Sequence, residues 1–333
     1  MGGMGINGIR QALEAQEQLI NIEAGNLTRS QIPGAQEVRG TLTGNDTINF
    51  GHAGTAAGPG VSLSATTLDF SQGQLQRTGF TTDMAISGEG LFVLLSPMHN
   101  ELFYTRRGDF HFDPDGYLVN TQGLYVAGFD PKTGELARIS IKVNPVTDAN
   151  GEEILDYLEN NGPDEDINIA TATGIPLATV QTTLGQLKGS GYVVSSTKLG
   201  VTTWASNLGE LGDRITFSSD GFLINETRGL KRGNQMALAK FPNMQGLVPG
   251  RFGGEVYKAT DAAVGGGIPE FGFPGDPNLG LGSLNTQALE SSTSNIISST
   301  GLMGLLQRNF TSTAAAMKAF ISAWDDLNNT IRS

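Results

Sequence analysis

The sequence predicts a mainly β protein with a terminal α-helical coiled coil, in which the N- and C-terminal helices pair and the β domains are inserted between them. Apolar residues recur at heptad spacing near both ends of the chain, as in paired helices. Short alternating stretches and Asp-Gly turns fill the middle, and 46 of the 333 residues are glycine, about twice the usual share. This composition favours short strands joined by tight turns.

The C-terminal helix has the clearest pattern, because its apolar residues alternate spacings of three and four from position 303 to position 331. As a helix this stretch would be about 44 Å long. Its other faces carry small and weakly polar residues, which indicates that neighbours cover more than one side. Eight of the nine seam positions are apolar; the nine are Met303, Leu306, Phe310, Thr313, Met317, Phe320, Trp324, Leu327 and Ile331.

A second heptad helix is predicted over residues 5–28, and Pro33-Gly34 ends it. Polar Gln16 and Glu23 stand at two of its seam positions. We expect the seams of the two helices to bury each other, so that everything between them is one long excursion. The apolar seam positions of this helix are Ile6, Ile9, Leu13, Ile20 and Leu27.

The texture of the chain divides the excursion into parts. Asp115-Gly116 and Asp220-Gly221 each separate two apolar strands, which is the signal of a tight hairpin. The predicted segments are 1–33 (first helix), 34–64 (extended connector), 65–144 (β domain, first part), 145–204 (inserted β domain or loop region), 205–287 (β domain, second part, with a Gly/Pro linker) and 288–333 (last helix).

The insertion contains the most acidic stretch of the chain. Seven carboxylates and no base lie between Gly151 and Asp166, and we expect a solvated surface loop there, with a cation site as the alternative. Residues 177–187 fit either a short helix or two strands, and their Thr and Val content favours strands.

Composition excludes several classes of function. The net charge is −12, without the clustered Lys and Arg that nucleic-acid binding requires, so we expect no nucleic-acid partner. The absence of cysteine excludes disulfides, thiolate metal sites and cysteine nucleophiles. We see no apolar run of membrane-spanning length and no cleavable signal pattern, and expect an exported protein that is not inserted in a membrane and leaves by a route without a cleaved signal.

Three short motifs have bland interpretations that we prefer. Gly3 to Gly8 matches G-x-G-x-x-G, but the strand that a dinucleotide fold needs does not precede it. Arg107-Gly108-Asp109 leads directly into a strand and is expected to form a turn. Asp113 to Gly116 resembles the start of a calcium loop, but Leu124 stands where the bidentate Glu is required.

No catalytic or metal-binding pattern stands out, so we predict no enzyme, no catalytic residue, no cofactor and no metal. The three histidines lack metal spacing. Carboxylate pairs such as Asp83 with Glu89, or Asp109 with Asp113, could be drawn for a glycosidase, but among 33 acidic residues such pairs arise by chance.

The stretch SQGQLQRTGFTTDMAISGEGLFVLL resembles the bacterial flagellar basal-body rod and hook protein family. The resemblance continues through Tyr104 to Phe110 and Asp115 to Gly123, and it reaches both ends at Glu23 to Leu27 and at Ala288 to Phe310. About two thirds of the chain is covered; residues 34–64 and 145–204 are not. The matching residues in the first stretch are Gly73, Leu75, Thr78, Asp83, Ala85, Ile86, Gly88, Gly90 and Phe92.

This resemblance implies a structural subunit that self-assembles helically into a tubular rod- or hook-like filament transmitting torque. It implies many copies of the chain as partners, together with neighbouring rod, hook or ring proteins and the flagellar type III export apparatus. The implied location is the basal body or hook, from periplasm to cell exterior. Two alternatives are a secreted β-rich adhesin or surface-filament protein, with the acidic insertion as its binding face, and a glycan-cleaving enzyme.

Overall fold

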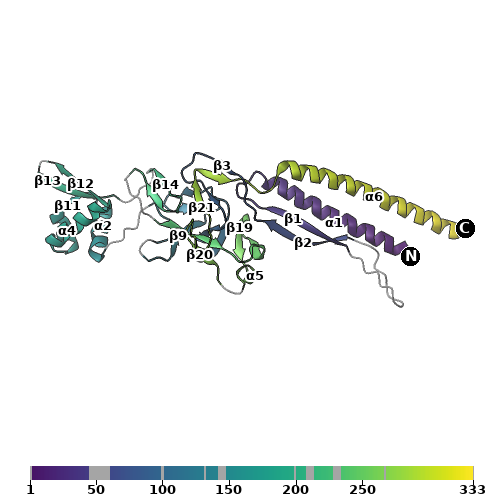
Figure 1. Ribbon diagram of the computed structural model, residues 1–333, viewed down its shortest axis with the longest axis horizontal. Coiled ribbons are helices and arrows are strands. Elements are labelled where there is room, and N and C mark those ends of the chain that lie inside the picture. Colours follow the sequence, from purple (N-terminus) through teal and green to yellow (C-terminus); the bar gives the residue numbers. More distant parts are fainter. Residues whose placement is uncertain are drawn as a thin grey trace. The chain divides into compact units, whose positions relative to one another are not determined.

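A computed structural model describes residues 2–44, 61–98, 101–130, 133–141, 148–198, 200–207, 214–227, 234–265 and 268–332 (Figure 1). The chain forms two compact units. The first comprises residues 1–74 and 291–333, and the second comprises residues 75–290. The predicted fold class is confirmed: the two terminal helices pack together, and the strands lie between them in the sequence. None of the helices in the described part combines the length and apolarity that crossing a membrane requires.

The first unit consists of two helices and a hairpin. Helix α1 (Gly2–Arg29) lies beside α6 (Ile296–Arg332) (Figure 1). Strands β1 (Glu37–Gly44) and β2 (Val61–Asp69) pair antiparallel, with an irregularity between Thr41 and Leu42, and both contact α1.

This hairpin differs from the predicted segment boundary. The expected connector, 34–64, supplies all of β1 and the first part of β2, and residues 65–74, expected in the β domain, belong to the first unit. The apolar residues of these strands pack on the helix, so they show no alternation of their own.

The second unit is built on an 11-stranded, mostly antiparallel sheet. Its main path runs β18-β19-β6-β5-β9-β8-β7, and β10, β16, β17 and β20 pair onto it. The bounds are β5 (Leu91–Leu95), β6 (Leu102–Thr105), β7 (His111–Phe112), β8 (Leu118–Val119), β9 (Tyr125–Phe129), β10 (Leu136–Arg138), β16 (Gln235–Met236), β17 (Leu238–Lys240), β18 (Leu247–Gly250), β19 (Gly253–Ala259) and β20 (Glu270–Gly272).

Smaller elements complete this body. A 3₁₀ turn (η1, Met244–Gly246) and α5 (Asp261–Val264) adjoin the sheet. The predicted Gly/Pro linker is partly ordered, since β20 pairs with β17. Three two-stranded ribbons are β3 (Leu75–Arg77) with β22 (Ala288–Glu290), β4 (Met84–Ser87) with β21 (Ser283–Thr286), and β14 (Ile215–Phe217) with β15 (Leu223–Asn225).

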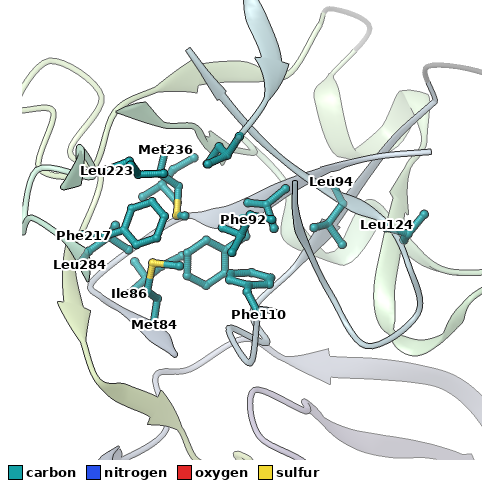
Figure 2. Packing of buried hydrophobic residues seen from close by; sticks show 14 of the residues in the cluster. Met84, Ile86, Phe92, Leu94, Phe110, Leu124, Phe217, Leu223, Met236 and Leu284 are labelled. Atoms are coloured by element: carbon teal, nitrogen blue, oxygen red, sulfur yellow. The ribbon is translucent and has the colours of Figure 1, made fainter. Parts of the chain in front are cut away.

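Both predicted hairpins are present. β7 pairs with β8 around Gly116, and β14 pairs with β15 around Gly221, and each glycine has a positive φ (86° and 84°) as tight turns require. Side chains from both halves of the β domain enclose one core, in which Phe217, Leu223 and Met236 lie close to Phe92 (Figure 2). The excursion therefore closes on itself.

The insertion is a small α/β body with its own core. Its helices are α2 (Ala149–Asn161), α3 (Asp166–Thr173) and α4 (Leu177–Gly189), and its sheet has the order β11-β13-β12, formed by Asp164–Glu165, Val201–Ser206 and Val193–Lys198. The core is a cluster of nine buried apolar residues: Ile154, Leu155, Leu158, Ile169, Ile175, Val180, Leu184, Leu187 and Val193.

Two predictions for the insertion are wrong. Residues 177–187, interpreted as strands, form α4, because Val180, Leu184 and Leu187 fall on one helical face that is buried. The expected acidic loop is mostly α2, which Asp148 caps by accepting a hydrogen bond from the Gly151 amide at 2.9 Å. Acidic residues occupy its exposed face, and Ile154 and Leu158 point inward.

Candidate assembly interface

The two terminal helices bring most of the predicted seam residues together. On α1, Ile9, Leu13, Ile20 and Leu27 are half-buried, whereas the side chain of Ile6 lies outside the described part. On α6, Leu306 is buried, and Met303, Phe310, Met317 and Phe320 are half-buried. The last three predicted seam residues of α6 are not covered.

Exposure rises along the seam of α6 toward its C-terminal end. Leu306 is 8% exposed, whereas Trp324 is 42%, Leu327 52% and Ile331 74% exposed. The Gln16 Nε2 to Thr313 Oγ1 hydrogen bond (3.4 Å) sets an antiparallel register in which the last turns of α6 reach the start of α1. A single copy therefore leaves the C-terminal part of this apolar stripe open to solvent.

Polar groups interrupt the covered part of the seam. Gln16 and Thr313 bond to each other across the helices, and Glu23 is buried at another seam position. Gln16 Oε1 and Ser299 Oγ are buried without a hydrogen-bond partner among the described residues. Polar residues at seam positions lower stability but fix the register of paired helices.

A second face of α1 carries the hairpin. Gly40 of β1 lies so close to this face that a Cβ there would be 2.7 Å from Leu19 Cδ2 and 3.1 Å from Ile22 Cδ1. Asn26, fully buried, holds the same strand: its Nδ2 donates to Val38 O (2.8 Å), and its Oδ1 accepts from the Val38 amide (2.9 Å). Sequence analysis missed the hairpin contacts of Leu19, Ile22, Asn26 and Gly40.

The root of α6 is tied to this hairpin. The Thr293 amide donates to Ala35 O (3.0 Å), and Thr293 Oγ1 accepts from the Glu37 amide (2.8 Å). The hydroxyl of Ser294 donates to Asn26 O (2.8 Å). These bonds join α1, β1 and the start of α6 in one polar junction.

Arg106 organises the second unit and was not singled out in the sequence. Its guanidinium is 6% exposed and donates to the carbonyls of Gly90 (2.5 Å), Gly88 (2.7 Å) and Ile86 (3.2 Å). Its Nε donates to Glu290 Oε2 (2.5 Å), and Glu290 is 2% exposed. One buried charge pair thus connects the β4–β5 loop to the last strand of the unit.

The short motifs have structural roles. Arg107 donates twice to Asp109 at 2.6 Å, and Gly108 is buried against Met84 O, so the RGD tripeptide is a closed turn. Asp113 Oδ1 accepts from the Tyr117 amide (2.7 Å) in the hairpin turn. Gly3 to Gly8 lie within α1.

The carboxylates that could be drawn as catalytic pairs have other partners. Glu89 pairs with Lys240 at 3.1 Å, and Asp109 pairs with Arg107. Burial, reinforced by the nearby Asp109 charge, raises the pKa of Asp83 despite a hydrogen bond from Thr78. Over the described ranges, no three His, Asp or Glu side chains gather closely enough to hold a metal ion.

Comparison with known proteins points in one direction. Residues 85–196, about a third of the chain, match the family model described as "Flagellar hook protein FlgE/F/G D1 domain". The flagellar hook protein FlgE of Helicobacter pylori is 30% identical over 184 residues, which cover 52% of this chain and 24% of that protein.

Two further relatives agree. The flagellar hook protein FlgE of Salmonella typhimurium is 39% identical over 93 residues (28% of this chain, 23% of that protein). The flagellar basal-body rod protein FlgG of Borreliella burgdorferi is 31% identical over 126 residues (34% and 47%). The chain spans less than half the length of each of these relatives.

Proposed function

The chain belongs to the flagellar hook and rod protein family, and from this premise we propose that it is a structural subunit that assembles helically into a tubular hook- or rod-like filament. Its role is mechanical and not catalytic: contacts between copies carry torque along the tube. The partners are further copies of the chain and neighbouring rod, hook or ring proteins. The protein reaches the basal body or hook through the flagellar export apparatus.

One observation carries this proposal, namely the open end of the α6 seam. Trp324, Leu327 and Ile331 continue the heptad pattern beyond the part that α1 covers, and they are between 42% and 74% exposed. Large apolar side chains aligned on one stripe are typical of a surface that another chain covers. Four more apolar residues of α6 are exposed outside the stripe and offer neighbours a second contact: Ile297, Leu302, Leu305 and Ile321.

The energy available at this stripe suits assembly. Completing the burial of three half-exposed large side chains contributes about 1 kcal/mol each, or about 3 kcal/mol for each copy. Each copy in a helical assembly makes this contact on both sides, because a heterologous interface uses two different surfaces of the same chain. The contact is modest for one pair and large for a filament.

Substitution of Trp324 tests the proposal. We expect Trp324→Asp to abolish filaments, because a carboxylate would then be buried between copies. Phe320→Ala should weaken assembly, because truncating a packed aromatic residue removes up to about 3–5 kcal/mol. Purified protein is concentrated, and filaments are scored by negative-stain electron microscopy and sedimentation.

Ser322→Asp is the matched control, since Ser322 is exposed on the same helix but lies off the heptad stripe. Circular dichroism should show unchanged β structure in all three variants. Normal filaments from Trp324→Asp would refute the assembly role of the stripe.

A further inference from the structure

The insertion carries an open sheet edge. β12 is the terminal strand of its sheet and pairs only with β13, in a continuous register from Val193–Ser206 to Lys198–Val201. Alternate amide and carbonyl groups of such a strand point away from the sheet. Proteins usually protect an edge with Pro, a bulge or a covering segment, and β12 contains no Pro and no irregularity in its pairing.

Charge is divided between the two edges of this sheet. Residues 148–207 contain eight acidic residues and two lysines, a net charge of −6, which is half of the chain's −12. Both lysines lie at the β12 edge: Lys198 ends the strand, and Lys188 Nζ donates to Ser195 Oγ at 2.7 Å. The opposite edge is β11, where Asp164 and Glu165 form the strand and Asp166 follows.

Helix α2 extends the acidic side. Its Tyr157 hydroxyl donates to Asp164 Oδ2 (2.7 Å), which places α2 at the β11 edge. The helix adds Glu152, Glu153, Asp156 and Glu159 to that side. The body therefore has one basic strand edge and one acidic edge, so that its two sides attract each other and two acidic sides repel.

We propose that the β12 edge of one copy docks against the acidic β11 edge of the next copy, head to tail. This contact rests on the proposed function, because it adds an outer interface to the helical assembly. The occupant is a second copy of this chain, selected by the opposite charges of the two edges. Such a heterologous contact repeats along an open helix, whereas β12-to-β12 pairing would stop at a dimer.

The contact is weak by itself. A six-residue strand edge buries much less surface than the roughly 1,200 Å² of stable interfaces. Within a filament the copies are already held together, and the high effective concentration makes a weak contact persistent. The contact must therefore be measured in assembled protein.

Cysteine cross-linking tests the proposal, since the natural chain has no cysteine. The full-length double variant Ser196→Cys/Ile167→Cys places one thiol on β12 and one directly after β11, at exposed positions. Sedimented filaments treated with a short bismaleimide should give a ladder of covalent oligomers on a denaturing gel. In the control, Gln186→Cys on α4 replaces Ser196→Cys and should give at least a fivefold weaker ladder.

Charge variants in the double-cysteine background provide the second measurement. Lys198→Glu should remove the ladder, and Lys198→Glu with Glu165→Lys should restore it. Filaments without a ladder would overturn this inference and leave the proposed function intact. Dimers from Ser196→Cys alone would also overturn it. Absence of any sedimenting filament would refute the proposed function, and the inference with it.

Discussion

The buried pair of Arg106 and Glu290 makes a quantitative prediction about the second unit. Replacing Arg106 with Met removes donors from three carbonyls and leaves the Glu290 carboxylate, 2% exposed, without its cation. Removing one partner of such a pair destabilises a protein by about 3–5 kcal/mol. This is a large share of the roughly 5–15 kcal/mol that stabilises a typical domain.

Arg107 is the matched control, because it is the same residue type one position later. Its pair with Asp109 is local and partly exposed, with both side chains 21% accessible. Such pairs contribute about 0–1 kcal/mol, so Arg107→Met should change stability little. The comparison therefore isolates the effect of burial from the loss of an arginine.

Urea unfolding measures the difference, with hydrogen exchange to locate it. Both tryptophans, Trp204 and Trp324, lie outside the main sheet, so the unfolding signal should be far-UV circular dichroism. Arg106→Met/Glu290→Leu should be more stable than Arg106→Met alone, because no orphan charge remains. Equal stability of Arg106→Met and Arg107→Met would refute the reasoning.

Two further variants test local packing and pH dependence. Gly40→Val should lift the β1–β2 hairpin from α1, destabilise it by about 1–3 kcal/mol and speed amide exchange in β1, whereas Gly44→Val, with nothing near its Cβ, should not. Asp83→Asn should raise the melting temperature at pH 7 and not at pH 3. The raised pKa of Asp83 means that its contribution to stability is present below the usual Asp pKa and is lost as pH rises. An equal shift at both pH values would contradict this assignment.

The parts of the fold that the sequence predicted correctly depend on short-range patterns. Both terminal helices follow from heptad spacing, and both Asp-Gly hairpins follow from turn chemistry. The family resemblance is confirmed because its motifs are long and collinear. In each case the decisive residues lie within a few positions of one another.

The missed parts depend on contacts between distant residues. Glu290 meets Arg106 across 184 positions, so neither residue announces the pair. Asn26 looks like an ordinary polar helix residue until Val38 of the hairpin lies against it. Helices α2 and α4 were missed because acidic and Thr-rich exposed faces concealed short apolar stripes that a small core buries.

The polar groups of the seam and its open end act together. An exposed stripe of Trp324, Leu327 and Ile331 would bind apolar surfaces without selectivity. The bond between Gln16 and Thr313 and the junction at Asn26 and Ser294 fix where α6 stands relative to α1. Because α6 is a continuous helix, that register also determines where Trp324 is presented to the next copy. Selectivity of assembly therefore depends on buried polar contacts within one copy, and affinity on apolar contacts between copies.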